Sequence, residues 1–186
     1  MNAVVIAGSR HPKGQTARAA EGLMTGLRAN ACEAKIAFLP DMKIESCRQC
    51  DEAGWGLCRE KGRCVIEDDF AGLVRKMSEA DVVVFATPVY FSDLSESLKA
   101  FLDRLRRITR HEDGRKDIAD KPAVGICVAG GGGGGAPRCC AELDRTLATC
   151  GFDVIDMVPV RRQNLENKIE TLEVTGRWVA DQIKKQ

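Results

Sequence analysis

The chain alternates between short apolar runs and longer stretches in which apolar positions recur every three or four residues. Five runs are mostly apolar and too short for helices, so each predicts a strand, with residues 34–39 the weaker candidate and the central runs buried on both faces of a sheet. These five runs are residues 3–8, 34–39, 81–86, 123–129 and 154–158.

Five segments between and after these runs carry apolar residues at helical spacing, which predicts amphipathic helices. Asp68 and Asp69 offer a capping carboxylate for the second of these helices. The helices are expected over residues 16–27, 70–77, 94–108, 140–150 and 165–183. Residues 41–67 show no clear period and are predicted to be a loop, and the charged stretch 109–121 is predicted to be a solvated loop.

Strands that alternate with helices indicate a parallel sheet, because parallel strands need crossover connections and both faces of the sheet must be covered. A length of 186 residues and a mass of 20.3 kDa fit one domain with one core. We therefore expect a three-layer α/β fold over residues 1–186, with five parallel strands between two layers of helices.

Composition narrows the class of protein. Lys and Arg number 28 against 27 Asp and Glu, for a formal net charge of +1, which argues against a nucleic-acid-binding surface. No apolar run is long enough to span a membrane, and the first residues show no signal peptide, so we expect a soluble, cytoplasmic protein. Nine cysteines, an odd number, make a disulfide framework unlikely in that compartment.

In a sheet of this type, ligands bind at the carboxyl ends of the strands. The loops at that edge are residues 9–16, 87–92 and 130–136. The first loop lacks the G-x-G-x-x-G of dinucleotide-binding folds, and Lys13 is not followed by the Ser or Thr of a Walker A motif. It also lacks a cysteine that could act as a nucleophile.

Each of the three loops has a functional interpretation and a plainer alternative. The first gathers Ser9, His11, Lys13, Gln15 and Thr16 at the start of a helix, an arrangement that attracts phosphate, although an ordinary capped turn would look the same. The second places Tyr90 beside Phe91, and these rings could lie against a planar ligand, although Phe91 could simply pack inward. The six glycines from 130 to 135 could let the backbone approach a flat ligand, or could form a flexible linker.

Four segments resemble one family. They read G-S-R-H-P-K-G-Q-T at 8–16, C-V-I-E-D-D at 64–69, T-P-V-Y-F at 87–91 and L-K-A-F-L-D-R at 98–104. They are similar to the G-S-x-R-x-x-G-N-T, C-x-I-x-D-D, T-P-x-Y-x and L-K-x-F-x-D-R segments of flavodoxin-like NAD(P)H-dependent FMN reductases and iron–sulfur flavoproteins. The match runs in the right order over roughly residues 2–150. It implies a flavodoxin-like sheet with strand order 2-1-3-4-5.

The resemblance also implies an FMN site. Ser9, Gln15 and Thr16 would hold the phosphate, with His11 and Lys13 nearby. His11 stands where the family usually has arginine, and Gln15 stands where it has asparagine. The residues that would flank the flavin ring system or close over its polar edge are Pro88, Val89, Tyr90, Phe91, Gly130, Gly131, Gly132 and Gly133.

A cysteine-rich loop at 44–67 carries a second candidate site. Cys47, Cys50, Cys58 and Cys64 have the spacing C-x2-C-x7-C-x5-C. This resembles the C-x2-C-x2-C-x5-C of iron–sulfur flavoproteins except for the longer middle gap. Four thiolates could bind a [4Fe–4S] cluster or a tetrahedral zinc ion, or the cysteines could bind no metal. Cys32, Cys127 and Cys150 are expected to be buried, whereas Cys139 and Cys140 follow the glycine loop and have at most a minor redox role.

These observations favour an FMN-dependent oxidoreductase, with the chemistry performed on the flavin and no catalytic side chain. NAD(P)H is the expected donor, and small molecules are the expected acceptors. The alternatives are a flavodoxin-type electron carrier, against which the near-zero net charge counts, and a zinc-stapled binding module without flavin. The resemblance further implies a homodimer or homotetramer, with the cysteine-rich loop and residues 109–120 near the interface.

Overall fold

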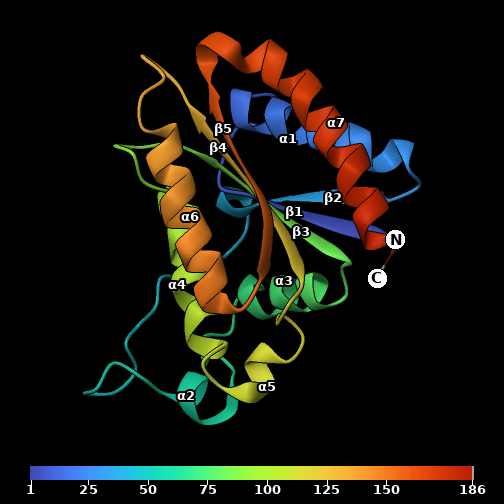
Figure 1. The fold of residues 1–186 in the computed structure, drawn as a ribbon. Helices are drawn as coiled ribbons and strands as arrows, with labels where there is room; N and C mark the ends of the chain where they lie inside the picture. Colours follow the sequence, from blue (N-terminus) through green and yellow to red (C-terminus); the bar gives the residue numbers. More distant parts are fainter. Residues whose placement is uncertain (186) are drawn as a thin grey trace.

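The structure is a computed structural model that describes residues 1–185. Its centre is a five-stranded parallel sheet with the order β2-β1-β3-β4-β5, as expected (Figure 1). Valine, isoleucine and alanine fill the central strands, which are buried on both faces. The strands are β1 (Asn2–Ala7), β2 (Glu33–Phe38), β3 (Val82–Pro88), β4 (Pro122–Ala129) and β5 (Asp153–Arg161).

Helices cover both faces of the sheet, which confirms the three-layer prediction (Figure 1). On one face lie α1 (Gln15–Ala29) and α7 (Leu165–Ile183). On the other lie α3 (Asp69–Ser78), α4 (Glu96–Ile108) and α6 (Ala136–Cys150). Four short helical turns complete the chain, namely η1 (Leu39–Asp41), α2 (Leu57–Lys61), α5 (Glu112–Arg115) and η2 (Arg162–Asn164).

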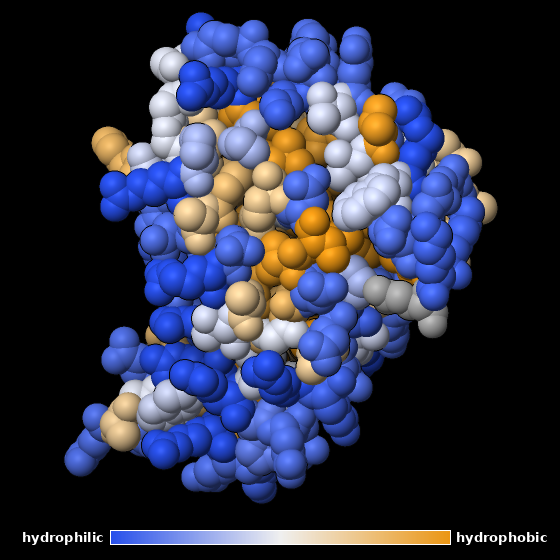
Figure 2. All heavy atoms as spheres, viewed as in Figure 1, coloured by the Kyte–Doolittle hydropathy of each residue, from blue (hydrophilic) through white to orange (hydrophobic). Residues whose placement is uncertain are grey.

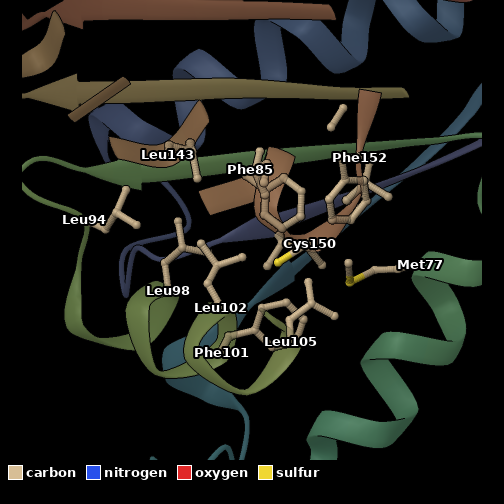
Figure 3. Packing of buried hydrophobic residues seen from close by; sticks show 14 of the residues in the cluster. Met77, Phe85, Leu94, Leu98, Phe101, Leu102, Leu105, Leu143, Cys150 and Phe152 are labelled. Carbon is tan, nitrogen blue, oxygen red and sulfur yellow. The ribbon is translucent and has the colours of Figure 1, made fainter. Parts of the chain in front are cut away.

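Each layer of helices buries its own apolar cluster against the sheet. On the α3–α4–α6 side, the rings of Phe85 and Phe152 meet edge to face with centroids 5.4 Å apart (Figure 3). Leu98, Phe101 and Leu102 project from α4 toward this pair (Figure 3). The alternation of residues along β1 explains the division, because Val4 and Ile6 face one cluster and Val5 faces the other.

Helix α4 begins later than the apolar spacing predicted. Its first residue is Glu96, and Leu94 lies buried in the preceding loop. Ser95 sets the start, because its hydroxyl accepts a hydrogen bond from the backbone N–H of Leu98. The backbone N–H of Ser95 also donates a hydrogen bond to Thr87 Oγ1 over 3.0 Å, which fixes the same boundary.

The two predicted loops are less open than expected. Residues 41–67 contain α2, and residues 109–121 contain α5. Ile118 is buried in the core, so the prediction of a wholly solvated loop at 109–121 is wrong. A single apolar residue in a charged stretch gives no periodic signal, and only tertiary packing reveals its role.

The surface is mainly hydrophilic, but apolar atoms gather between α6 and α7, where the edge strand β5 lies (Figures 1 and 2). Several residues of β5 are only half-buried. None of the described helices is both long enough and apolar enough to span a bilayer.

Candidate functional site

The three expected loops meet at the carboxyl edge of the sheet and form one open cleft of about 440 Å³. The cleft lies where β1 is flanked by β2 and β3, the point at which the strand order reverses. Its volume is in the range of small-ligand sites. The lining residues are Ser9, His11, Gly14, Gln15, Thr16, Pro88, Val89, Tyr90, Val128, Ala129, Gly130, Gly131 and Gly134.

The first loop presents polar groups at the start of α1. Ser9 and Thr16 are buried there, and the N–H of His11 donates to Ser9 Oγ over 3.4 Å. A backbone hydrogen bond from Gly14 N to the His11 oxygen closes the turn. In the described residues, α1 has no side-chain cap and no acidic residue in its first turn. Its N-terminal N–H groups and dipole therefore suit an anion. Lys13 is exposed and does not line the cleft.

The second loop is a tight turn. Tyr90 and Asp93 exchange two backbone hydrogen bonds of 3.0 and 2.9 Å, and the two residues between them have positive φ angles, 51° at Phe91 and 67° at Ser92. Both angles are unusual for residues that carry a Cβ. The turn leaves Phe91 fully exposed and outside the cleft, so the alternative that it packs inward is wrong. Tyr90 does line the cleft.

The glycine loop folds as ordered turns rather than as a flexible linker. Gly133 N donates to the Gly130 oxygen over 2.8 Å, and Gln163 Nε2 donates to the Gly131 oxygen over 3.0 Å. Gly133 has a φ of 77° and packs against Arg161 and Gln163 instead of the cleft. Gly132 does not line the cleft either, and the glycines of this loop that do line it are Gly130, Gly131 and Gly134.

A hydroxyl network supports the floor beneath the first two loops. Ser97 Oγ donates to the Gly8 oxygen over 3.2 Å, and the N–H of Gly8 donates to the Ala86 oxygen over 2.8 Å. A Cβ at Gly8 would overlap the Ser95 hydroxyl, so the first motif requires glycine at this position. Sequence reasoning missed Ser95 and Ser97, which belong to a helix start that the apolar spacing placed two residues too early.

The cysteine-rich loop forms a separate pocket at the far end of α4 from the cleft (Figure 1). All four cysteines of the motif line it, together with Trp55, Arg104 and Arg107. The cavity measures about 20 Å³, room for about one water. Cys50 is exposed and the other three are half-buried. Within residues 1–185, no three Cys, His, Asp or Glu side chains lie close enough to hold a metal ion. The donor types therefore fit a cluster or zinc, but the loop would have to close around it.

A buried ion pair fixes the base of this loop. Arg104 Nη1 and Nη2 donate to the two oxygens of Asp68 over 2.6 and 2.9 Å, and both side chains are almost completely buried. Asp68 also accepts from the N–H of Glu45, and Asp69 accepts from the N–H of Lys43. The two carboxylates therefore join both ends of the loop. The C-V-I-E-D-D and L-K-A-F-L-D-R motifs thus meet each other, away from the cleft.

Comparison with known sequences decides the family. The model of the NADPH-dependent FMN reductase family matches residues 1–167. The chain belongs to this family. The prediction made from the four motifs is confirmed, and the shared motifs divide between the cleft and the ion pair at the base of the cysteine-rich loop.

Relatives of this family member include several proteins named iron–sulfur flavoprotein. That of Methanocaldococcus jannaschii is 30% identical over 131 residues, which are 70% of this chain and 65% of the relative. That of Methanosarcina thermophila is 32% identical over 99 residues, 53% of this chain and 47% of the relative. The chain therefore matches less than two thirds of the length of these curated relatives.

Solved structures share the fold of this family member. An NAD(P)H:quinone oxidoreductase from Methanothermobacter marburgensis superposes with a TM-score of 0.70 at 21% identity, covering 96% of both chains. RosB, solved with a bound 8-demethyl-8-formylriboflavin-5'-phosphate, gives a TM-score of 0.73 at 18% identity, covering 100% of this chain and 81% of RosB. At these identities the likeness shows the flavodoxin-like fold.

The remaining cysteines of this family member are buried, as expected for Cys32, Cys127 and Cys150. Burial raises the pKa of Cys150 to about 12. The neighbouring thiols of Cys139 and Cys140, together with burial, raise the pKa of Cys127 far above its ordinary value. Cys32 is buried as well, and burial raises the pKa of its thiol. Thiols held in the protonated form are poor nucleophiles, so Cys32, Cys127 and Cys150 are structural side chains.

Proposed function

We propose that this chain is an FMN-dependent oxidoreductase that takes electrons from NAD(P)H and passes them to a small-molecule acceptor. The observation that carries the proposal is the cleft in which three loops, distant in the sequence, combine a helix N-terminus, an aromatic side chain and a glycine backbone. Membership of the NADPH-dependent FMN reductase family supports the same conclusion.

In the proposed complex, Ser9, Gln15 and Thr16 bind the phosphate through their side chains and the N–H groups of α1. His11 lies beside them and donates to the phosphate or to the ribityl chain. Pro88, Val89 and Tyr90 flank the ring system. Gly130 and Gly131 offer backbone N–H groups to its polar edge. Lys13, Phe91, Gly132 and Gly133 would join the site only if the loops close on the ligand.

When bound, FMN supplies hydride acceptance and the release of electrons one or two at a time. The protein's part is to hold the ring, to limit the access of water and to leave one face open for the donor. No side chain of the cleft has to exchange a proton in this scheme. That division of work fits a lining made of backbone, hydroxyl and aromatic groups.

Binding of FMN and riboflavin to Thr16→Val tests the phosphate site. Loss of one hydrogen bond to a charged phosphate costs about 1.5–3 kcal/mol, so we expect FMN affinity to fall about 10- to 100-fold. Riboflavin lacks the phosphate, so its affinity should stay the same. Thr171→Val on the exposed face of α7 is the matched control. Absence of FMN binding to the wild type, or equal weakening for both ligands, would contradict the proposal.

Turnover separates the enzyme from the electron carrier. We expect the FMN-loaded protein to oxidise NAD(P)H continuously when a quinone or free flavin is supplied. A yellow protein without turnover would instead indicate the carrier. A colourless protein with one zinc per chain would indicate the binding module.

For the cysteine-rich loop we propose a [4Fe–4S] cluster held by Cys47, Cys50, Cys58 and Cys64. Four thiols around one pocket support it, as do relatives named iron–sulfur flavoprotein. After anaerobic purification we expect about four iron and four sulfide per chain, and loss of both in Cys58→Ser. Stoichiometric zinc, or no metal at all, would overturn this assignment and leave the FMN site untouched.

We also propose that the chain forms a homodimer or homotetramer, with the cysteine-rich loop and residues 109–120 near the interface. The apolar surface between α6 and α7 gives a further candidate contact (Figure 2). Light scattering should give a mass two or four times 20.3 kDa, and a monomeric mass would contradict the proposal. Nine free cysteines in the described residues favour a reducing, cytoplasmic location.

A further inference from the structure

Arg104 is the largest buried charged side chain of the molecule, with 1% of its surface exposed. It extends from α4 beneath the cysteine-rich loop. Its two terminal nitrogens are occupied, since Nη1 donates to Asp68 and to the Glu45 oxygen, and Nη2 donates to Asp68. The guanidinium also lies over the ring of Phe70, 4.2 Å from the centroid.

The third nitrogen of Arg104 is the exception. Nε is buried, yet it has no hydrogen-bond partner among the described residues. Buried polar groups are nearly always paired, because an unpaired one has lost its hydrogen bonds to water without replacing them. The charge partner, the two Nη donors and the stacking ring of this side chain are all in place, so the unpaired Nε indicates that a partner is missing or incompletely approached.

The sulfur of Cys64 is the candidate for that partner. Cys64 and Arg104 line the same pocket. The Cys64 thiol is adjacent to the Arg104 guanidinium, close enough to interact with its charge. Cys64 lies only four residues before Asp68. The hydrogen bonds from Nη1 and Nη2 to Asp68 orient the guanidinium and so fix the direction of Nε.

We propose that Arg104 is a positioning residue whose Nε directs its N–H at the Cys64 sulfur, a contact present in the metal-free loop that shortens to a hydrogen bond when the cysteine-rich loop holds its cluster. The inference rests on the [4Fe–4S] centre proposed above. Only arginine meets the requirement, because its planar fork can bind Asp68 with two nitrogens and still direct a third donor elsewhere. Lysine at this position could keep the charge but not both contacts.

Arg107, one turn along α4, provides the internal comparison. It also reaches the cysteine-rich loop, but its Nη1 donates to the Gly54 oxygen over 2.6 Å and its guanidinium lies 4.9 Å from the Trp55 ring centroid. The hydrogen bond of Arg107 is with a backbone oxygen, and its ring contact is with Trp55. Arg107 therefore anchors the inserted residues between the second and third cysteines, while Arg104 addresses a sulfur.

A donor to a ligand sulfur stabilises the additional negative charge of a reduced cluster and so raises its reduction potential. In Arg104→Lys we therefore expect the cluster to reduce at a lower midpoint potential than in the wild type, measured by redox titration with EPR detection. Arg106→Lys should leave the midpoint unchanged, because the Arg106 guanidinium pairs with Asp103 on the exposed side of α4 and does not line the pocket. An unchanged midpoint in Arg104→Lys with full iron content would overturn the inference.

A second measurement does not depend on the cluster. In metal-free full-length protein, the urea midpoints of Arg104→Lys, Cys64→Ala and the double variant form a double-mutant cycle. We expect the double variant to lose less than the sum of the single losses, whereas Arg104→Lys with Cys58→Ala should be additive. Additivity in both cycles would overturn the contact. If the wild-type protein contains no iron after anaerobic purification but Arg104 is still coupled to Cys64 and not to Cys58, the cluster is rejected and the contact is retained.

Discussion

A single buried carboxylate, Asp68, closes the cysteine-rich loop at its base. Burial alone would raise the pKa of Asp68, but hydrogen bonds from Arg104 and from the N–H groups of Glu45 and Phe70 outweigh it and hold the pKa below its ordinary value. The same carboxylate caps α3. Its charge therefore stabilises the start of α3, the buried Arg104 and the first segment of the loop at Glu45 together.

Replacing this carboxylate should destabilise the whole protein. In Asp68→Asn the Arg104 charge loses its buried partner, and breaking such a pair costs about 3–5 kcal/mol in the free energy of unfolding. Asp103→Asn removes one member of a half-exposed pair with Arg106 and should cost less than about 1 kcal/mol. Urea unfolding of both variants checks the difference, and comparable losses would contradict the burial argument.

The pH dependence of stability follows from the lowered pKa of Asp68. An aspartate with a depressed pKa in the folded state contributes stability that is present above its unfolded pKa of about 3.9 and is lost as pH falls through the folded value. Wild-type stability should therefore fall below about pH 4, and Asp68→Asn should fall less steeply there. Urea midpoints from pH 7 to pH 3 measure this, and parallel curves would reject the assignment.

At the scale of elements, α4 joins the two sites. Its cap, Ser95, and Ser97 support the floor of the cleft, Phe101 and Leu102 fill the core (Figure 3), and Arg104 holds the cysteine-rich loop. A rise of about 1.5 Å per residue places Ser95 and Arg104 about 14 Å apart along the axis. One rigid helix thus sets the position of the cleft relative to the cysteine pocket.

Helices α1 and α7 pack through glycines, and this close contact predicts the effect of adding a methyl group there. A Cβ at Gly26 would overlap the backbone oxygen of Glu173 on α7. Gly26→Ala should therefore lower the free energy of unfolding by about 1–3 kcal/mol, even though alanine favours helices. Gly72→Ala in α3 meets no atom within 4 Å and should raise it by about 0.5–1 kcal/mol. Thermal unfolding of the pair checks the sign, and a stabilised Gly26→Ala would contradict the close packing.

At the scale of the whole molecule, a ligand that bridges three loops should stabilise the entire fold. FMN at 100 times its dissociation constant should add about 2.7 kcal/mol, which is a rise of about 5–10 °C in Tm for a chain of this size. Riboflavin at the same concentration should raise Tm less, because it lacks the phosphate. Calorimetry with each ligand tests this, and equal shifts would argue that the first loop does not bind phosphate.

The five strands, the five main helices and the position of the ligand site at the carboxyl edge of the sheet all follow from the sequence alone. Apolar runs of strand length can be buried only inside a covered parallel sheet, and the topology then sends the loops that follow β1, β3 and β4 to one edge. The cleft-lining role of Ser9, Thr16 and Tyr90 could therefore be anticipated from chain position alone, as could burial of Cys32, Cys127 and Cys150.

Which loop residues face the cleft and which turn away from it depends on the tertiary structure. Phe91 points outward and Gly133 packs on Arg161 because backbone φ angles, which the sequence pattern does not encode, direct them. Burial of Ile118 and the union of Asp68 with Arg104 depend on contacts between segments far apart in the chain. Periodicity reports which face of an element is apolar, whereas a pairing between distant polar groups exists only once the elements have packed.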